Sequence, residues 1–73
     1  MPINIVLVDD HELVLNGFIQ LIQSDDAFVV VDSFGNAEDA LASDVITEDC
    51  ILVTDISLPN KNGLELVKEI KKR

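Results

Sequence analysis

With 73 residues, 48% of them hydrophobic, the chain is long enough for one small globular domain and too short for two. Its net charge of −9 argues against direct contact with nucleic acid or an anionic membrane, because binding phosphates requires a basic surface. The single cysteine excludes an internal disulfide and fits a cytoplasmic protein, and we expect neither a signal peptide nor a membrane span.

Three short apolar runs rich in β-branched residues predict β-strands over Ile3–Val8, Phe28–Phe34 and Cys50–Thr54. The first and third runs lack strict alternation of apolar and polar residues. That pattern is typical of parallel strands covered on both faces by helices. We therefore expect both strands to be buried, with Cys50 as an inert core thiol.

Apolar residues at helical spacing predict three helices between and after these strands. The first covers residues 13–22, the second is short and covers 37–41 with Asn36 as its N-cap, and the third covers 64–70. The order βαβαβα predicts an α/β domain, a parallel three-stranded sheet flanked by helices as in the doubly wound folds.

Acidic residues directly follow two of the predicted strands: Asp9 and Asp10 follow the first, and Asp55 follows the third. With strand order 2-1-3 these strand ends are neighbours at the edge where open parallel sheets bind ligands. Clustered carboxylates repel each other, so they need protons or a bound cation, and Mg²⁺ prefers oxygen ligands. The pattern predicts a Mg²⁺ site for phosphoryl transfer, with one Asp as the nucleophile.

Simpler interpretations of these residues remain open. The pair Asp9 and Asp10 also fits a solvated turn, and Asp55 also fits a helix or turn cap, although its place after a buried strand favours function. We interpret His11 as a solvent-facing loop residue without a catalytic role. A lone histidine lacks the second nitrogen or sulfur ligand that zinc sites use.

Three blocks of the sequence, at residues 5–11 (IVLVDDH), 52–59 (LVTDISLP) and 62–66 (NGLEL), carry a family resemblance. Together, and with their spacing, they resemble the receiver domains of two-component response regulators, and within these the NarL/FixJ group. The resemblance spans all 73 residues. It implies a flavodoxin-like (CheY-like) doubly wound domain, of which the chain holds the first part.

The resemblance also implies a role for each site residue. Asp55 is the phosphoacceptor and contacts Mg²⁺, Asp10 is a direct Mg²⁺ ligand, Asp9 holds the ion through water, and the backbone carbonyl of Ser57 is a further ligand. The phosphodonor is a sensor histidine kinase, and the intact protein controls transcription through a C-terminal DNA-binding domain. The domain is not an enzyme, although it assists its own phosphorylation and dephosphorylation.

A complete receiver domain has five strands, and its fourth and fifth carry a Ser or Thr and a Lys that contact the phosphoryl group. We expect residues 1–73 to be an incomplete receiver domain without these strands and their helices. Lys61, in the loop after Asp55, does not fit the missing role. We therefore expect weak Mg²⁺ binding, slow phosphorylation without a conformational readout, and association or homodimerisation through the exposed edge of the third strand and the uncovered face of the first helix.

Two functions from other classes also fit the residues. One is a fragment of a phosphatase or phosphotransferase with an Asp nucleophile, which requires a second Asp at the position of Ser57. The other is a stand-alone acidic interaction module that completes the sheet of a receiver partner.

Overall fold

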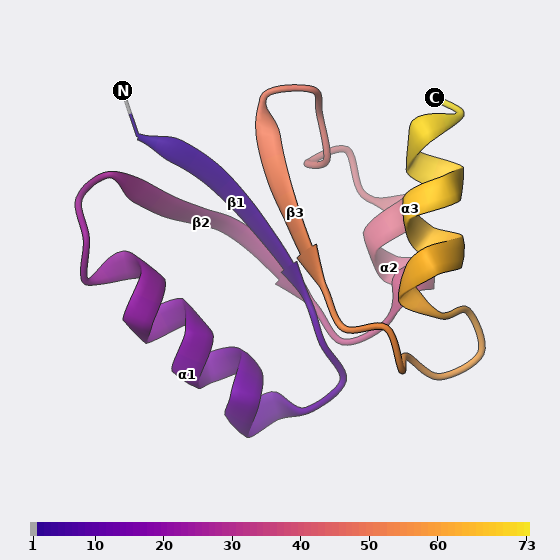
Figure 1. The fold of residues 1–73 in the computed structure, drawn as a ribbon, viewed down its shortest axis with the longest axis horizontal. Coiled ribbons are helices and arrows are strands. Elements are labelled where there is room, and N and C mark those ends of the chain that lie inside the picture. Colours follow the sequence, from indigo (N-terminus) through magenta and orange to yellow (C-terminus); the bar gives the residue numbers. More distant parts are fainter. Residues whose placement is uncertain (1) are drawn as a thin grey trace.

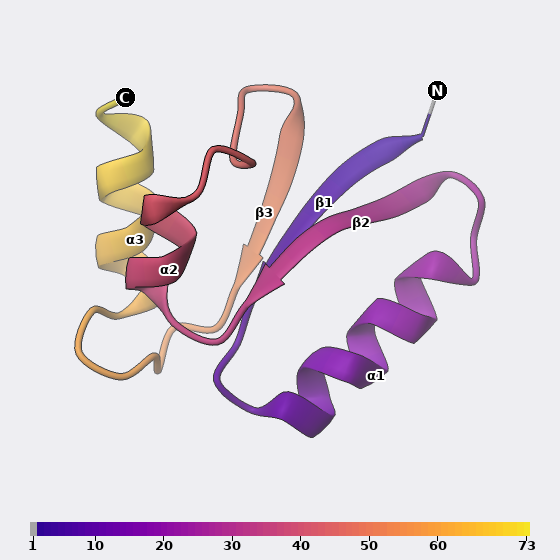
Figure 2. The same ribbon diagram turned by 180° about the vertical axis from the view of Figure 1, so that it is seen from behind.

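The structure, a computed structural model, describes residues 2–73. Its elements in chain order are β1 (Ile3–Val8), α1 (Glu12–Gln23), β2 (Phe28–Phe34), α2 (Ala37–Ala42), β3 (Cys50–Thr54) and α3 (Gly63–Lys71). The α/β class, the βαβαβα order and the bounds of the three strands are confirmed. Helix α1 lies on one side of the sheet and α2 and α3 on the other, as Figures 1 and 2 show from opposite directions.

The three strands form one parallel sheet in the order β2-β1-β3. The carboxyl ends of all three are in register, because Val8 pairs with Phe34 on one side and with Thr54 on the other. The register of β2 shifts between the partners of Ile5 and Val6, so Val31 is an extra residue without a partner in β1. The sequence pattern did not predict this irregularity.

The central strand β1 supplies much of the core. Its last four residues, 5–8, are all buried, although their side chains point alternately to opposite faces of the sheet. On the face covered by α2 and α3, Val8 packs with Leu58, Leu66 and the two buried alanines of α2, Ala37 and Ala40. These alanines are three positions apart and share one face of α2, so the helix approaches the sheet closely.

The expectation that the third strand is buried on both faces is wrong. In β3, Ile51 is 49% exposed and Val53 is 43% exposed. Cys50 is only partly buried, and its thiol forms hydrogen bonds with the backbone of Thr47. The reason is the position of α1, which packs against β2 and leaves this side of β3 open. Phe18 of α1 and Val53 both line a hollow of about 270 Å³ on this side.

Side-chain caps fix the starts of α2 and α3. Asn36 Oδ1 accepts a hydrogen bond of 2.7 Å from Asp39 N, which confirms Asn36 as the N-cap of α2. At α3, Asn62 Oδ1 accepts a bond of 2.9 Å from Glu65 N, and Glu65 Oε1 accepts one of 3.2 Å from Asn62 N. This reciprocal pair is a capping box, which determines where α3 begins.

The loop from β3 to α3 returns tightly to the backbone of Asp55. Gly63 N donates a hydrogen bond of 2.9 Å to Ile56 O, and a Cβ atom at Gly63 would lie 2.3 Å from the carbonyl oxygen of Asp55. Only glycine permits this contact, because the atom in the way belongs to the backbone. The first residue of α3 is thus packed directly on the peptide that follows Asp55.

This contact predicts that Gly63→Ala destabilises the protein by about 1–3 kcal/mol, the usual cost of forcing an extra carbon into filled space. The matched control is Gly17→Ala in α1, where a Cβ meets nothing within 4 Å and alanine should stabilise the helix by about 0.5–1 kcal/mol. Urea denaturation followed by circular dichroism measures both changes. A Gly63→Ala variant as stable as the wild type would contradict the contact.

Candidate functional site

The backbone of the sheet holds the two acidic segments side by side. Beyond the strand ends, Asp9 N donates to Phe34 O at 3.0 Å, and Asp55 N donates to Val8 O at 2.9 Å. These bonds extend the parallel ladder by one step past β1 and β3. The prediction that the ends of the first and third strands are neighbours is therefore confirmed.

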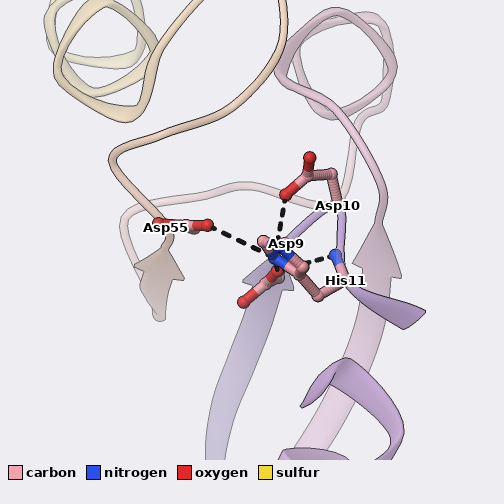
Figure 3. A group of neighbouring side chains, drawn as sticks. All are labelled: Asp9, Asp10, His11 and Asp55. Carbon is pink, nitrogen blue, oxygen red and sulfur yellow. Dashed lines mark hydrogen bonds and ion pairs between the residues drawn. The ribbon is translucent and has the colours of Figure 1, made fainter. Parts of the chain in front are cut away.

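The side chains that leave these strand ends converge on one point (Figure 3). One ligand atom each from Asp9, Asp10, His11 and Asp55 lies within 4.8 Å of the other three. Backbone N–H groups hold two of the carboxylates: Asp9 Oδ1 accepts from His11 N at 2.8 Å, and Asp55 Oδ1 accepts from Ser57 N at 3.2 Å. The cluster remains open to solvent, with Asp10 and His11 both exposed.

His11 is solvent-facing as predicted, with 64% of its side chain exposed, but it also enters the acidic cluster. Its Nδ1 lies 3.1 Å from Asp9 Oδ1, 3.1 Å from Asp10 Oδ1 and 3.8 Å from Asp55 Oδ2. The hydrogen bond with Asp9 and the negative charges of Asp10 and Asp9 raise the pKa of His11 above its ordinary value. This contact was not predicted from the sequence. The signal that could have indicated it is the position of His11 directly after Asp9 and Asp10.

The donor set of the cluster fits a hard divalent cation. Asp9, Asp10 and Asp55 present carboxylate oxygens, which suit Mg²⁺, and the ion would offset their mutual repulsion. Opposite ligands of an octahedral ion with bonds of about 2.1 Å lie roughly 4.2 Å apart. Ligand atoms within 4.8 Å of one another are close to that arrangement, so one ion needs only small side-chain movements.

The loop after β3 contains two further residues, Ser57 and Lys61, whose roles at the site were in question. Ser57 is exposed and its N–H binds Asp55 Oδ1, while its carbonyl as a metal ligand stays a prediction. Lys61 forms an ion pair with Glu69 of α3, and this hydrogen bond raises the pKa of Lys61. Lys61 is thus engaged by α3, which agrees with the expectation that it does not serve the acid cluster.

The fold and this cluster together define a doubly wound α/β domain with an acidic cluster at the carboxyl edge of its sheet. Residues 5–73 match the response regulator receiver domain family, and the chain belongs to that family. The predicted family is confirmed, and so is the NarL/FixJ-like character, since the nitrate/nitrite response regulator NarL of Escherichia coli is among the relatives.

Individual relatives support the same assignment. The chain is 34% identical over 71 residues to the DNA-binding transcriptional activator DevR/DosR of Mycobacterium tuberculosis, covering 97% of this chain and 33% of that protein. It is 37% identical over 70 residues to the transcriptional regulatory protein UhpA of Escherichia coli, covering 96% and 36%. The RcsB response regulator of Salmonella typhimurium superposes with a TM-score of 0.84 at 27% identity, covering 99% and 38%.

The chain therefore spans about a third of the length of the curated relatives it matches. None of the helices that the structure describes has the length and apolar character that crossing a membrane requires.

The contacts of His11 predict its titration. Its pKa should exceed the ordinary value of about 6.5, so the stability that the charged ring contributes is fully present below pH 6.5 and is lost as pH rises through the raised pKa. NMR titration of the ring protons measures this pKa without ambiguity, because the chain has one histidine.

Asp9→Asn should lower the His11 pKa towards its ordinary value, because it removes the negative charge and replaces the carboxylate that accepts from the ring by a weaker, neutral amide acceptor. Asp26→Asn, at an exposed position beyond the far end of α1, is the matched control and should leave the pKa unchanged. A wild-type pKa at or below the ordinary value would be incompatible with the observed cluster.

Proposed function

We propose that Asp55 is a phosphoacceptor and that Asp9, Asp10 and Asp55 hold Mg²⁺ beside it, with the Ser57 carbonyl as a further ligand. The observation that carries this proposal is the convergence of the three carboxylates at the carboxyl edge of the sheet. Membership of the receiver family supports it, because phosphorylation and Mg²⁺ are typical of that family.

The two oxygens of Asp55 have different surroundings, which suggests how the residue reacts. Oδ1 is held by the N–H of Ser57, whereas Oδ2 faces the cluster at 3.8 Å from His11 Nδ1. We assign Oδ2 as the attacking atom. It forms a bond to phosphorus while the bond from phosphorus to the donor's leaving group breaks, and the leaving group takes the electron pair. Mg²⁺ held by Asp9 and Asp10 would neutralise charge on the transferring oxygens.

The phosphodonor in this proposal is a sensor histidine kinase, and the intact protein controls transcription. The relative DevR/DosR is named a DNA-binding transcriptional activator, which supports this role. The net charge of −9 argues against DNA binding by these 73 residues themselves and supports a separate C-terminal DNA-binding domain. The domain accepts a group on its own side chain and is not an enzyme acting on a separate substrate.

The phosphatase alternative loses support, because the chain belongs to the receiver family and Ser57 stands where a second acid is needed. The edge of β3, which has no partner strand among the described residues, also fits the stand-alone interaction module, but that alternative gives the converging carboxylates no role.

Incubation with acetyl phosphate and Mg²⁺, followed by intact mass measurement, tests the assignment of Asp55. The wild type should slowly gain the mass of one phosphoryl group, and Asp55→Asn should gain none, because an amide is not a nucleophile here. Asp49→Asn is the matched control: Asp49 is an exposed acid next to the opposite end of β3, and this variant should label like the wild type. Labelling that persists in Asp55→Asn, or none in any protein, would refute the assignment.

We also propose that copies of this chain associate through β3. Its outer edge has no partner strand among the described residues, and Ile51 and Val53 expose an apolar surface beside it. Sedimentation should show concentration-dependent association that Ile51→Lys weakens, because a charged edge strand resists pairing. Leu64→Lys, which charges an apolar residue 59% exposed on α3, should not weaken it. A wild type that sediments as a monomer at all concentrations would contradict this surface.

A further inference from the structure

An imidazole nitrogen stands among the carboxylates that are proposed to hold the metal. His11 Nδ1 is 3.1 Å from one oxygen of Asp9 and 3.1 Å from one oxygen of Asp10. We propose that His11 is itself a metal ligand, and that it makes this site select nitrogen-preferring first-row ions such as Co²⁺, Ni²⁺ and Zn²⁺ more strongly than three carboxylates alone. This inference rests on the proposed metal site and specifies which ions that site takes.

The spacing of the atoms supports ligation through Nδ1. Ligand atoms bound at about 2.1 Å lie roughly 3.0 Å apart in adjacent octahedral positions and roughly 3.4 Å apart in a tetrahedron. The two distances of 3.1 Å fall within this interval. The ring therefore already lies where one corner of a coordination shell would be.

The partners of Nδ1 are the carboxylates of the cluster, with a hydrogen bond to Asp9 Oδ1, so an ion bound among them would replace the proton on this nitrogen. His11 is the N-cap residue of α1 with φ −95° and ψ 99°, yet its side chain makes no capping bond to the helix. Its backbone N–H binds Asp9 Oδ1 at 2.8 Å, which fixes the residue against the cluster while the ring remains 64% exposed. The ring is thus anchored beside the carboxylates without a structural task in α1.

The chemistry of the donor explains the selectivity. Carboxylate, carbonyl and water oxygens suit Mg²⁺, whereas imidazole suits Zn²⁺, Ni²⁺ and related ions. Adding one imidazole to a carboxylate site should therefore strengthen binding of the second group and change Mg²⁺ binding little. The alternative is that the His11 ring occupies the position where the ion would bind. Removing the ring should then strengthen the binding of every divalent ion.

Calorimetric titration with Zn²⁺ and separately with Mg²⁺ at pH 7.5 distinguishes these cases. All proteins carry Cys50→Ser, which removes the thiol as a second zinc donor. His11→Ala and His11→Asn should each weaken Zn²⁺ binding roughly tenfold or more while Mg²⁺ affinity changes less than about threefold. In the parent protein, Zn²⁺ should shift the ¹⁵N resonance of the His11 ring at Nδ1, and no other histidine contributes.

Stronger binding of both ions to His11→Ala, or an unchanged Zn²⁺ affinity, would overturn the inference. A zinc-induced shift at Nε2 instead of Nδ1 would also overturn it. Asp10→Asn separates this failure from that of the proposed function. If it weakens Mg²⁺ binding while the His11 variants leave Zn²⁺ binding intact, the carboxylate site stands and only the role of His11 falls. If Asp10→Asn leaves binding of both ions unchanged, the carboxylate site and the role of His11 both fall.

Discussion

The parallel pairing of β1 with both β2 and β3 is the constraint on which the rest of the structure depends. It aligns the carboxyl ends of the strands, and the ladder continues through Asp9 N to Phe34 O and Asp55 N to Val8 O. Main-chain hydrogen bonds thereby fix the relative positions of Asp9 and Asp55, which are more than forty residues apart in the sequence. The position of the acidic cluster follows from the backbone of the sheet, and only its fine geometry is left to side chains.

Bringing three carboxylates together is unfavourable unless something compensates their repulsion. The backbone N–H groups of His11 and Ser57 each bind one carboxylate, and the His11 ring offers positive charge to all three when it is protonated. The cluster is therefore assembled from local contacts within two short turns.

Much of this arrangement could be predicted from the sequence, for reasons that particular residues make clear. The runs of β-branched residues predicted the strands with their bounds, and a strand end followed at once by Asp9 or Asp55 predicted where the acids meet. The exposure of Ile51 could not be predicted, because hydrophobic pattern does not say which strand a helix covers. The extra residue Val31 and the orientation of His11 likewise depend on tertiary geometry.

One signal was present in the sequence and was not used. Asn62 followed three residues later by Glu65 is the pattern of a capping box, and it marks the start of α3. Reading it would have placed the beginning of that helix at Gly63 and shortened the loop after Asp55 accordingly.

The glycine at this helix start has a mechanical consequence. Because Gly63 has no side chain, its backbone packs directly against the carbonyl of Asp55. A displacement of the Asp55 peptide must therefore either move the amino end of α3 or disrupt this backbone contact. Asp55 is thus coupled to one helix by close backbone packing, which surface charge and salt do not change.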